Sequence, residues 1–569
     1  MKRIVLILIL YSITSNSILS EEQKIEEKNF LLIENKKQEK ESKDNLKLGG
    51  LIRFRPEMKY NYDFNRSLND NVNFTGQKIQ FYIHKEFNKD LEAKITIQDS
   101  RIWGGERGSS TGLNTANDGT RQSTDIREAW LKTKNIFDLP LHLQVGRQIL
   151  AYGDERLVGS LDWTNVGRSF DGARIILEEK YFTTHLWVMV LGENNSDIAG
   201  NTSALGRNTS YNAKFNCPPG AIKACTSVPD APIRELGDSY FTGFYNTIKL
   251  SEIFHIDLYY LGLQKKILEA NNSVILSQTG TLGSPESRAG RMDILNTYGI
   301  RITNKTQQNK KSIQEFDYAL EYATQSGRNG NNIRPGWDSL NTQVESTDLL
   351  TGNKYKNNIY REKVKYNSYA YAIDLGYTID TFRIGLGYDV GSGDPNRQDG
   401  SISTFQNLFH TNHIWYGMAD QVSWVNMKSK SINLTATTQS IGIFRVDYFI
   451  VDKDKRQDGW YDVSGNLKTG SSTESFSNNR FDSSSLFTNN GSGSYRPVGS
   501  LGKNLFREID FLWAVSYKSI NWSFGYSVIY GGDSIKNQVD DATKLSTAFT
   551  KKNFSGIADF GYIMMTYLF

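Results

Sequence analysis

Ten basic residues of this chain are spaced so that their side chains would gather in one enclosed space. Each lies on the polar face of a segment of alternating apolar and polar residues, or in a loop beside one. An arginine stays charged at neutral pH and binds a carboxylate through two parallel hydrogen bonds, so the chemistry expected here is anion binding. A structural ion pair with a neighbouring acid is the alternative for each residue. The ten are Arg53, Arg55, Lys78, Lys94, Arg127, Arg147, Arg168, Arg174, Arg301 and Arg383.

Acidic residues are assigned to the same inward faces, so the enclosed space is expected to carry charges of both signs. The arrangement predicted is a mixed ladder, with arginines on one wall and acids on the other. Such a field suits a channel for small solutes as well as a channel for a charged polymer. The acids assigned to these faces are Glu57, Glu92, Asp171, Asp257, Asp317, Glu321, Asp374, Asp389 and Asp447.

The alternating segments that must hold these side chains recur along nearly the whole chain. In residues 381–390, Phe382, Ile384 and Leu386 share one face, while Arg383 lies on the other. An apolar face opposite a charged one, repeated over many segments, is typical of a barrel whose strands contact lipid outside and water inside. The fold predicted is therefore all-β, an antiparallel up-and-down transmembrane β-barrel of about 18 strands.

The links between these segments alternate between short and long. Short links, such as residues 378–380, are followed by long ones rich in Gly, Asn, Ser and Asp. This order predicts short periplasmic turns on one rim and long extracellular loops on the other. About 18 strands enclose a lumen too wide for wall side chains to fill, so water, inward-folded loops or a plug must occupy it. The long loops are expected at residues 102–121, 151–171, 192–237, 265–292, 326–365, 391–427, 453–507 and 532–556.

The two ends of the chain predict a place in the outer membrane. A basic start and a short apolar run mark residues 1–20 as a signal peptide. Residues 21–45 are mostly charged or polar and are expected to form a periplasmic segment, with the barrel filling residues 46–569. The aromatic Phe569 ends an alternating strand, a signature of outer-membrane barrels, and the barrel-assembly machinery is expected to bind there.

Other kinds of site have weaker support. The 66 basic and 62 acidic residues nearly balance, which argues against a nucleic-acid binder. Cys217 and Cys225 are close together and are expected to form a disulfide in an exported protein. His410 and His413 have no cluster of further ligands in the sequence, so a structural loop role is expected for them. No metal, cofactor or catalytic site is predicted.

Several motifs of the chain resemble the alginate-export family of outer-membrane barrels. The resemblance covers most of the predicted barrel and includes two of the long loops. The matching stretches are L-I-R-F-R-P-E at 51–57, D-I-R-E-A-W at 125–130, V-G-R-Q at 145–148, Y-G-D-E-R-L-V-G at 152–159, D-W-T-N-V-G-R-S-F-D-G at 162–172, G-S-G-D-P-N at 391–396, F-Q-N-L-F-H-T-N-H at 405–413 and G-M-A-D at 417–420.

The resemblance implies a monomeric 18-stranded channel whose arginine-rich constriction passes an anionic polysaccharide. It adds weight to Arg127, Arg147, Arg168 and Arg174, which lie inside the matching stretches. The function expected is a channel for an alginate-like polymer or a sugar acid, with access controlled by the outer loops and a periplasmic turn.

A diffusion porin for small solutes is one alternative, and a surface adhesin that acts through its long loops is another. The surroundings expected are outer-membrane lipid and lipopolysaccharide.

Overall fold

The computed structural model describes the greater part of the predicted barrel. No helix among them is both long and apolar enough to cross a membrane. The predicted signal peptide, nearly all of the charged segment at 21–45, and both Cys217 and Cys225 lie outside the described residues. The described residues are 45–66, 70–103, 123–192, 239–251, 253–267, 291–305, 315–328, 344–347, 354–357, 365–395, 401–438, 440–456, 458–465, 487–489, 495–497, 502–537, 539 and 554–569.

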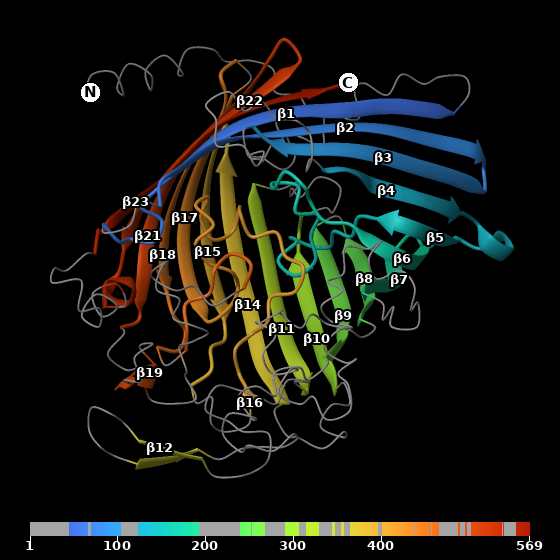
Figure 1. The fold of residues 1–569 in the computed structure, drawn as a ribbon. Helices are drawn as coiled ribbons and strands as arrows, with labels where there is room; N and C mark the ends of the chain where they lie inside the picture. Colours follow the sequence, from blue (N-terminus) through green and yellow to red (C-terminus); the bar gives the residue numbers. More distant parts are fainter. Residues whose placement is uncertain are drawn as a thin grey trace, which may run out of the picture.

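Eighteen long antiparallel strands form one closed ring. Figure 1 shows the course of the strands around it. Each strand pairs with the next along the chain, and β1 pairs with β23 to close the ring. The prediction of an antiparallel barrel of about 18 strands is confirmed. The ring strands are β1 (Leu46–Tyr60), β2 (Val72–Asn88), β3 (Leu91–Ile102), β4 (Ser123–Thr133), β5 (Leu141–Gln148), β6 (Phe170–Glu178), β7 (Phe182–Gly192), β8 (Ser239–Ser251), β9 (Phe254–Ile267), β10 (Arg291–Thr303), β11 (Phe316–Arg328), β14 (Lys365–Ile379), β15 (Phe382–Gly391), β17 (Met427–Thr438), β18 (Gly442–Asp452), β21 (Asn504–Tyr517), β22 (Ile520–Gly531) and β23 (Ile557–Leu568).

The remaining elements are short and lie in the links. The two-residue strand β16 pairs in parallel with β14, and two small hairpins stand apart from the ring. A 3-10 helix occupies the turn between β4 and β5. These elements are β12 (Val344–Thr347), β13 (Lys354–Asn357), β16 (Ser401–Ile402), β19 (Phe487–Asn489), β20 (Tyr495–Pro497) and η2 (Ile136–Asp138).

The two faces of the ring strands have the chemistry that alternation predicts. On β15 the side chains of Phe382, Ile384 and Leu386 are 61%, 49% and 52% exposed on the outer face. Arg383 and Asp389 lie on the opposite face, and Asp389 is only 2% exposed. An apolar outer face that leaves its side chains open is what a lipid-facing wall requires.

The links confirm one rim of short turns and one of long connections, but two long links do more than connect strands. Short turns join β6 to β7, β14 to β15 and β21 to β22, while every link at the opposite rim is longer. Residues 149–169, and residues 392–395 together with 401–426, start from the long-loop rim and turn back into the ring (Figure 1). We call them the first and second inner loop. Both were predicted among the long loops of the outer rim, with inward-folded loops left open as the filling of the lumen, and these two take the inward course because charged wall residues bind them inside.

A charge placed on the outer face should destabilise the barrel. Ile432 lies near the middle of β17 and is 47% exposed on that face. We expect Ile432→Arg to lower the free energy of unfolding in lipid by about 2–4 kcal/mol, the cost of a cationic side chain near the bilayer centre. Urea unfolding in vesicles, followed by heat-modifiable gel mobility, measures this change. Ile432→Leu is the control and should cost less than about 1.5 kcal/mol; equal losses for the two variants would contradict a lipid-facing position.

Candidate functional site

The two inner loops are joined by backbone hydrogen bonds into one unit. The amide of Gly159 donates to the carbonyl of Phe409 at 2.7 Å, and the amide of Phe409 donates to the carbonyl of Leu157 at 2.8 Å. The amide of Thr411 donates to the carbonyl of Glu155 at 2.9 Å, so the pairing continues along both loops. This pairing satisfies backbone groups that would otherwise be buried in the lumen without partners. The two inner loops therefore form a single unit inside the ring, which we call the insert.

Aromatic rings fix the start of the first inner loop to the wall. The ring of Tyr152 stacks between Trp187 and Tyr245, with centroid distances of 4.9 and 4.7 Å. Its hydroxyl lies 2.9 Å from Nδ1 of His185. Stacked aromatic pairs add to the free energy of burying their area, so this contact stabilises the inward course of the loop.

Cationic side chains on β1 and β2 bind the middle of the first inner loop. Arg53 donates from Nη1 to the carbonyl of Asp162 at 2.8 Å and from Nη2 to the carbonyl of Thr164 at 2.9 Å. Nζ of Lys78 donates to the same Asp162 carbonyl at 3.3 Å. Both side chains face inward, as predicted, and both residues are 2% exposed. The loop therefore covers cations that alternation assigns to the lumen.

Arg55 makes a second contact of this kind and also stacks on an aromatic ring. It donates to the carbonyl of Trp163, and its guanidinium lies 3.8 Å from the centre of that indole ring. Glu57, two residues along β1, is its ion-pair partner. The other face of Trp163 stacks on the ring of His413, with 3.6 Å between the ring centres, and Oδ2 of Asp420 accepts from Nδ1 of that histidine at 3.1 Å. A cation over an indole ring is a favourable electrostatic contact.

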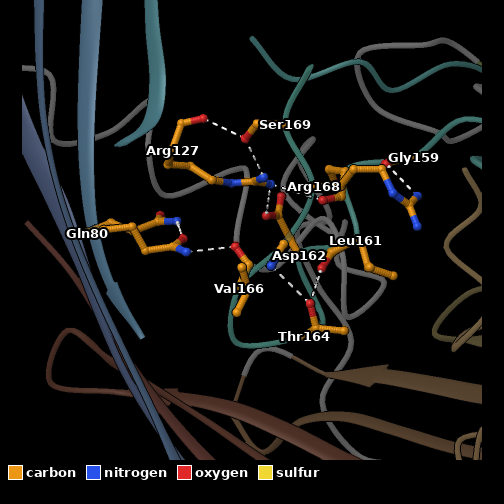
Figure 2. Close-up of polar contacts among 12 residues, drawn as sticks. Gln80, Arg127, Gly159, Leu161, Asp162, Thr164, Val166, Arg168 and Ser169 are labelled. Carbon is orange, nitrogen blue, oxygen red and sulfur yellow. Dashed lines mark hydrogen bonds and ion pairs between the residues drawn. The ribbon is translucent and has the colours of Figure 1, made fainter. Parts of the chain in front are cut away.

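Arg127 on β4 holds the carboxylate of the same segment (Figure 2). Its Nη1 donates to Oγ of Ser169 at 2.9 Å, and its Nη2 donates to Oδ1 of Asp162 at 2.8 Å and to the carbonyl of Ser160 at 3.0 Å. The loop passes directly over this guanidinium at Gly167. A Cβ on Gly167 would lie 2.7 Å from Cζ of Arg127, and its φ of +74° also favours glycine.

The opposite wall reverses the signs, because there the loop supplies the arginine and the strands supply the acids. Arg156 of the first inner loop donates to Asp374 on β14 at 2.8 Å and to Asp389 on β15 at 3.1 Å. Its guanidinium lies 3.8 Å from the centre of the Trp415 ring in the second inner loop. Burial disfavours the charge, but the two acids raise the pKa of Arg156 well above its ordinary value. Arg156 therefore stays charged and ties the insert to this wall.

A second ion pair reinforces that attachment. Arg301 on β10 donates from Nε and Nη2 to the two carboxylate oxygens of Asp154, at 2.9 and 2.8 Å, and from Nη1 to Asp257 at 2.9 Å. Burial opposes the charge of Asp154, yet Arg301 and Arg156 hold the pKa of that carboxyl well below its usual range. The fork geometry suits a guanidinium that grips one carboxylate with two bonds.

The remaining predicted cations have varied partners. Arg168 donates to the carbonyls of Gly159 and His410, and burial next to Arg127 lowers its pKa to about 10. The other contacts are Arg174 with Gln144 at 2.9 Å, Lys94 with Glu128 at 2.7 Å, and Arg383 with Asp317 at 2.8 Å.

Arg147 and Asp171 have to be reassigned. They lie opposite each other in the β5–β6 register, on the same face as Val145 and Ile175, whose side chains are exposed outside. The prediction placed both in the lumen. Arg174 of β6 faces inward, so Asp171, three positions before it on the same strand, faces outward, and Arg147 faces outward with its register partner Asp171. Their contact is loose, at 3.8 Å between Nε and Oδ1.

The predicted acids other than Asp171 lie on inward positions of their strands. Each has a partner from the wall or the insert. The pairs are Glu57 with Arg55, Glu92 with Lys132 and Lys134, Asp257 with Arg301, Asp317 with Arg383 and Lys305, Glu321 with Tyr259, Asp374 and Asp389 with Arg156, and Asp447 with Arg445.

Sequence reasoning missed several residues that position the insert. Asp154, Arg156 and Asp162 lie in loops, where alternation gives no face, although all three fall inside matching motifs. Glu508 and Asp510 on β21 were also missed, and they accept hydrogen bonds from the amides of the second inner loop at residues 418–419. The two acids lie two positions apart on an alternating strand, and this spacing could have assigned both to the inward face.

One group of described side chains has the geometry of a metal site. Ligand atoms of His84, Glu86 and Glu92 lie within 4.8 Å of one another at the short-turn rim. Lys132 and Lys134, however, already bind Glu92, at 3.5 and 3.0 Å. Their ammonium charges oppose a divalent cation. The two histidines considered from the sequence make structural contacts, His410 with the carbonyl of Val463 and His413 with Asp420.

Comparison with known proteins gives a family and distant structural relatives. The model of the family described as Alginate export matches residues 44–190 and 235–549, more than half of the chain. No curated protein has a significant similarity to this chain. The outer membrane protein OprD from Pseudomonas aeruginosa has 9% identity and a TM-score of 0.46, with 93% of this chain and 95% of that chain covered. OccAB1 from Acinetobacter baumannii has 11% identity and a TM-score of 0.46, with 94% and 99% covered.

Removing the Arg156 charge should loosen the insert. Arg156→Gln leaves Asp374 and Asp389 buried without their cation, and breaking a buried pair in this way costs about 3–5 kcal/mol. We expect a loss of that order in the free energy of unfolding and a larger single-channel conductance in planar bilayers. Arg147→Gln is the matched control: its ion pairs are 3.7 and 3.8 Å long and partly exposed, so it should change stability by less than about 1 kcal/mol. Similar losses for both variants would contradict the attachment described.

Acid should loosen the second inner loop through His410. Burial lowers the pKa of this histidine to about 4, whereas an unfolded histidine titrates at about 6.5. The unfolded chain therefore binds the proton more tightly, and the stabilisation is complete above pH 6.5 and decreases as pH falls toward 4. We expect a loss of about 2–3 kcal/mol at pH 4.5 that His410→Gln removes. Urea unfolding at pH 7 and 4.5 measures it, with His84→Gln as the control; an unchanged pH dependence in His410→Gln would contradict this account.

Proposed function

Because this chain belongs to the alginate-export family, we propose that it forms an outer-membrane channel that passes an anionic polysaccharide or a sugar acid. The solute would cross through the ring of strands, past the insert formed by the two inner loops. Selection would occur where the first inner loop meets the cationic side chains of β1, β2 and β4. The arginines would act as binding groups for carboxylates and not as catalysts.

One observation carries the proposal, which is the concentration of positive charge around residues 159–168. Five described cations contact this stretch or belong to it, and three carboxylates lie among them. A guanidinium remains charged throughout the physiological range and matches the planar carboxylate of a uronic acid. The cations are Arg53, Arg55, Lys78, Arg127 and Arg168, and the acids are Glu57, Glu155 and Asp162.

Electrostatic attraction in a narrow, low-dielectric passage is the mechanism proposed. Walls of low dielectric focus the field of the cations and raise the local concentration of an anionic solute. Each carboxylate would exchange a hydration shell for charged donors and then pass to the next cation. Movement requires binding that is favourable at several sites but tight at none of them.

A porin for small solutes is the second candidate, and the opposite wall favours it. From β9 to β21 the inward acids outnumber the inward cations among the described residues. A passage with cations on one side and acids on the other orients small polar solutes and does not demand a polymer. The acids of that wall are Asp257, Asp293, Asp317, Glu321, Asp374, Asp389, Asp447, Glu508 and Asp510, and its cations are Arg301, Lys305, Arg383 and Arg445. The adhesin alternative depends on long loops that lie mostly outside the described residues.

The closed ring also supports a monomer that needs no partner strand. Pairing of β1 with β23 leaves the barrel without a free strand edge, and the carbonyl of Phe569 accepts from the amide of Gly50 at 2.8 Å. Lipid and lipopolysaccharide would surround the apolar outer face. The C-terminal strand is the segment that we propose the assembly machinery recognises.

Selectivity measurements test this function. In planar bilayers under a salt gradient we expect an anion preference, and a soluble polyuronate should block the current in proportion to its occupancy. Arg127→Gln removes a charged donor and should weaken the block about ten- to a hundredfold, since such a bond contributes about 1.5–3 kcal/mol. Arg147→Gln, on the outer face, should leave it unchanged. A cation preference without polyuronate block would overturn the proposal.

A further inference from the structure

Two neighbouring acids on β21 are buried and have no ion-pair partner within the described part of the chain. Glu508 and Asp510, which we call the acid pair, lie two positions apart on the inward face and are 0% and 1% exposed. Asp374 and Asp389 differ from them, because each binds Arg156. Two ionised carboxyl groups that are this deeply buried lose their hydration and also repel each other.

The second inner loop supplies one neutral donor to each carboxyl group of the acid pair. The amide of Ala419 donates to Oε1 of Glu508, and the amide of Met418 donates to Oδ2 of Asp510, both at 2.9 Å. The loop lies directly on the pair at Gly417, where a Cβ would collide with the carboxyl group of Glu508. These amides satisfy one oxygen on each side but add no net positive charge, so the repulsion between two carboxylates would remain.

One oxygen of each carboxyl group is left over. Oε2 of Glu508 and Oδ1 of Asp510 are buried and accept no hydrogen bond from a described residue. The two carboxyl groups lie within reach of a side-chain hydrogen bond to each other. Two ionised carboxylates cannot form such a bond, because both are acceptors, whereas a protonated one donates through its O–H. A single proton between the two groups would satisfy both oxygens and remove one of the two charges.

We propose that Glu508 and Asp510 form a proton-binding site, which holds one proton at neutral pH and makes the attachment of the second inner loop depend on pH. With the proton bound, the acid pair carries one negative charge, and the amides of residues 418 and 419 stabilise it. Loss of the proton would place two charges under the loop, and water would reach them only if residues 417–419 moved away. The pair would hold its proton whatever solute crosses the channel.

The two strands beside β21 bring no charge that could replace the proton. Asp510 is paired in register with Asp447 on β18 and with Ser527 on β22. Asp447 binds Arg445 of its own strand at 2.7 Å, so this acid and this base balance each other. Ser527 is neutral. On the described parts of these strands the acid pair therefore faces one more carboxylate and no surplus positive charge.

The segments that cover the acid pair are also without surplus positive charge. Asp420 of the second inner loop binds Nδ1 of His413 at 3.1 Å. The hydroxyl of Tyr62, in the link between β1 and β2, donates to the carbonyl of Ala419 at 3.0 Å. Nζ of Lys59 on β1 lies 5.5 Å from the centre of the Tyr62 ring and forms no ion pair with the two acids. Among the described groups around the pair, none replaces the proton.

Unfolding at alkaline pH tests the site. Unfolded Glu and Asp release their protons at about pH 4, so above this pH the folded pair binds one proton more than the unfolded chain. While the pair keeps that proton, each pH unit should raise the equilibrium constant for unfolding about tenfold. The double variant Glu508→Gln/Asp510→Asn keeps an acceptor for each loop amide but has no carboxyl group, and it should lose this dependence. Urea unfolding in vesicles at pH 7 and pH 9 measures it.

A single variant and a control complete the unfolding experiment. Glu508→Gln alone places a neutral donor beside Asp510 and should lose most of the same pH dependence. Asp171→Asn removes an exposed acid from the outer face and should unfold with the pH dependence of the wild type. Heat-modifiable gel mobility establishes that each variant is folded.

Infrared difference spectra detect the proton directly. A protonated carboxyl group has a C=O stretching band that is separate from the bands of a carboxylate. At pH 7 the spectrum of the wild type minus that of the double variant should contain one such band, and the subtraction with Asp171→Asn should not. In the wild type this band should disappear as pH rises, together with the loss of stability.

Three outcomes would overturn the proposal. The first is an unchanged pH dependence of unfolding in the double variant, and the second is a difference spectrum without the band of a protonated carboxyl group. The third concerns a divalent cation, which is the other way to neutralise two carboxylates. Stabilisation of the wild type by calcium chloride that the double variant loses would assign the pair to that cation and not to a proton.

Discussion

The rest of the structure depends on the need to neutralise charge inside a closed ring. Pairing of β1 with β23 encloses a space that its own side chains cannot fill, and alternation directs arginines, lysines and acids into that space. A buried charge is tolerated only where it is paired and hydrogen-bonded. The two inner loops supply the missing partners, so the filling of the lumen and the satisfaction of its charges are one event.

The insert is held to the two walls by bonds of opposite polarity. On the β1–β4 wall the strands provide cations, and the loop offers carbonyls and one aspartate. On the wall that includes β14 and β15 the strands provide acids, and Arg156 of the loop binds them. Arg301 of β10, which binds Asp154 of the loop, is an exception with the polarity of the first wall. Reversing either set would place like charges in contact, so this pattern fixes which side of the insert faces which wall.

The sequence predicted the ring well and its contents poorly. Strand number, outer face and rims follow from a period of two, which is local and repeats along the chain. Arg147 and Asp171 were misassigned because the polar character of their side chains was given more weight than their position in the alternation. The inward course of residues 149–169 could not be derived, because a loop has no periodicity and its partners are hundreds of residues away. The separation of Arg156 and Asp389 along the chain, 233 positions, illustrates this.

The two attachments of the insert differ in strength. On the acidic wall, Arg156 and the Arg301–Asp154 fork join charge to charge in nearly complete burial, so this side of the insert is anchored. On the cationic wall, Arg53, Arg55 and Lys78 donate to backbone carbonyls of the loop, Arg55 also pairs with Glu57 of its own strand, and Arg127 binds Asp162, whose side chain is half exposed. Breaking a bond between two buried charges costs more than breaking a bond to a neutral carbonyl or to a half-exposed carboxylate. The insert is therefore attached more firmly to the acidic wall than to the cationic wall.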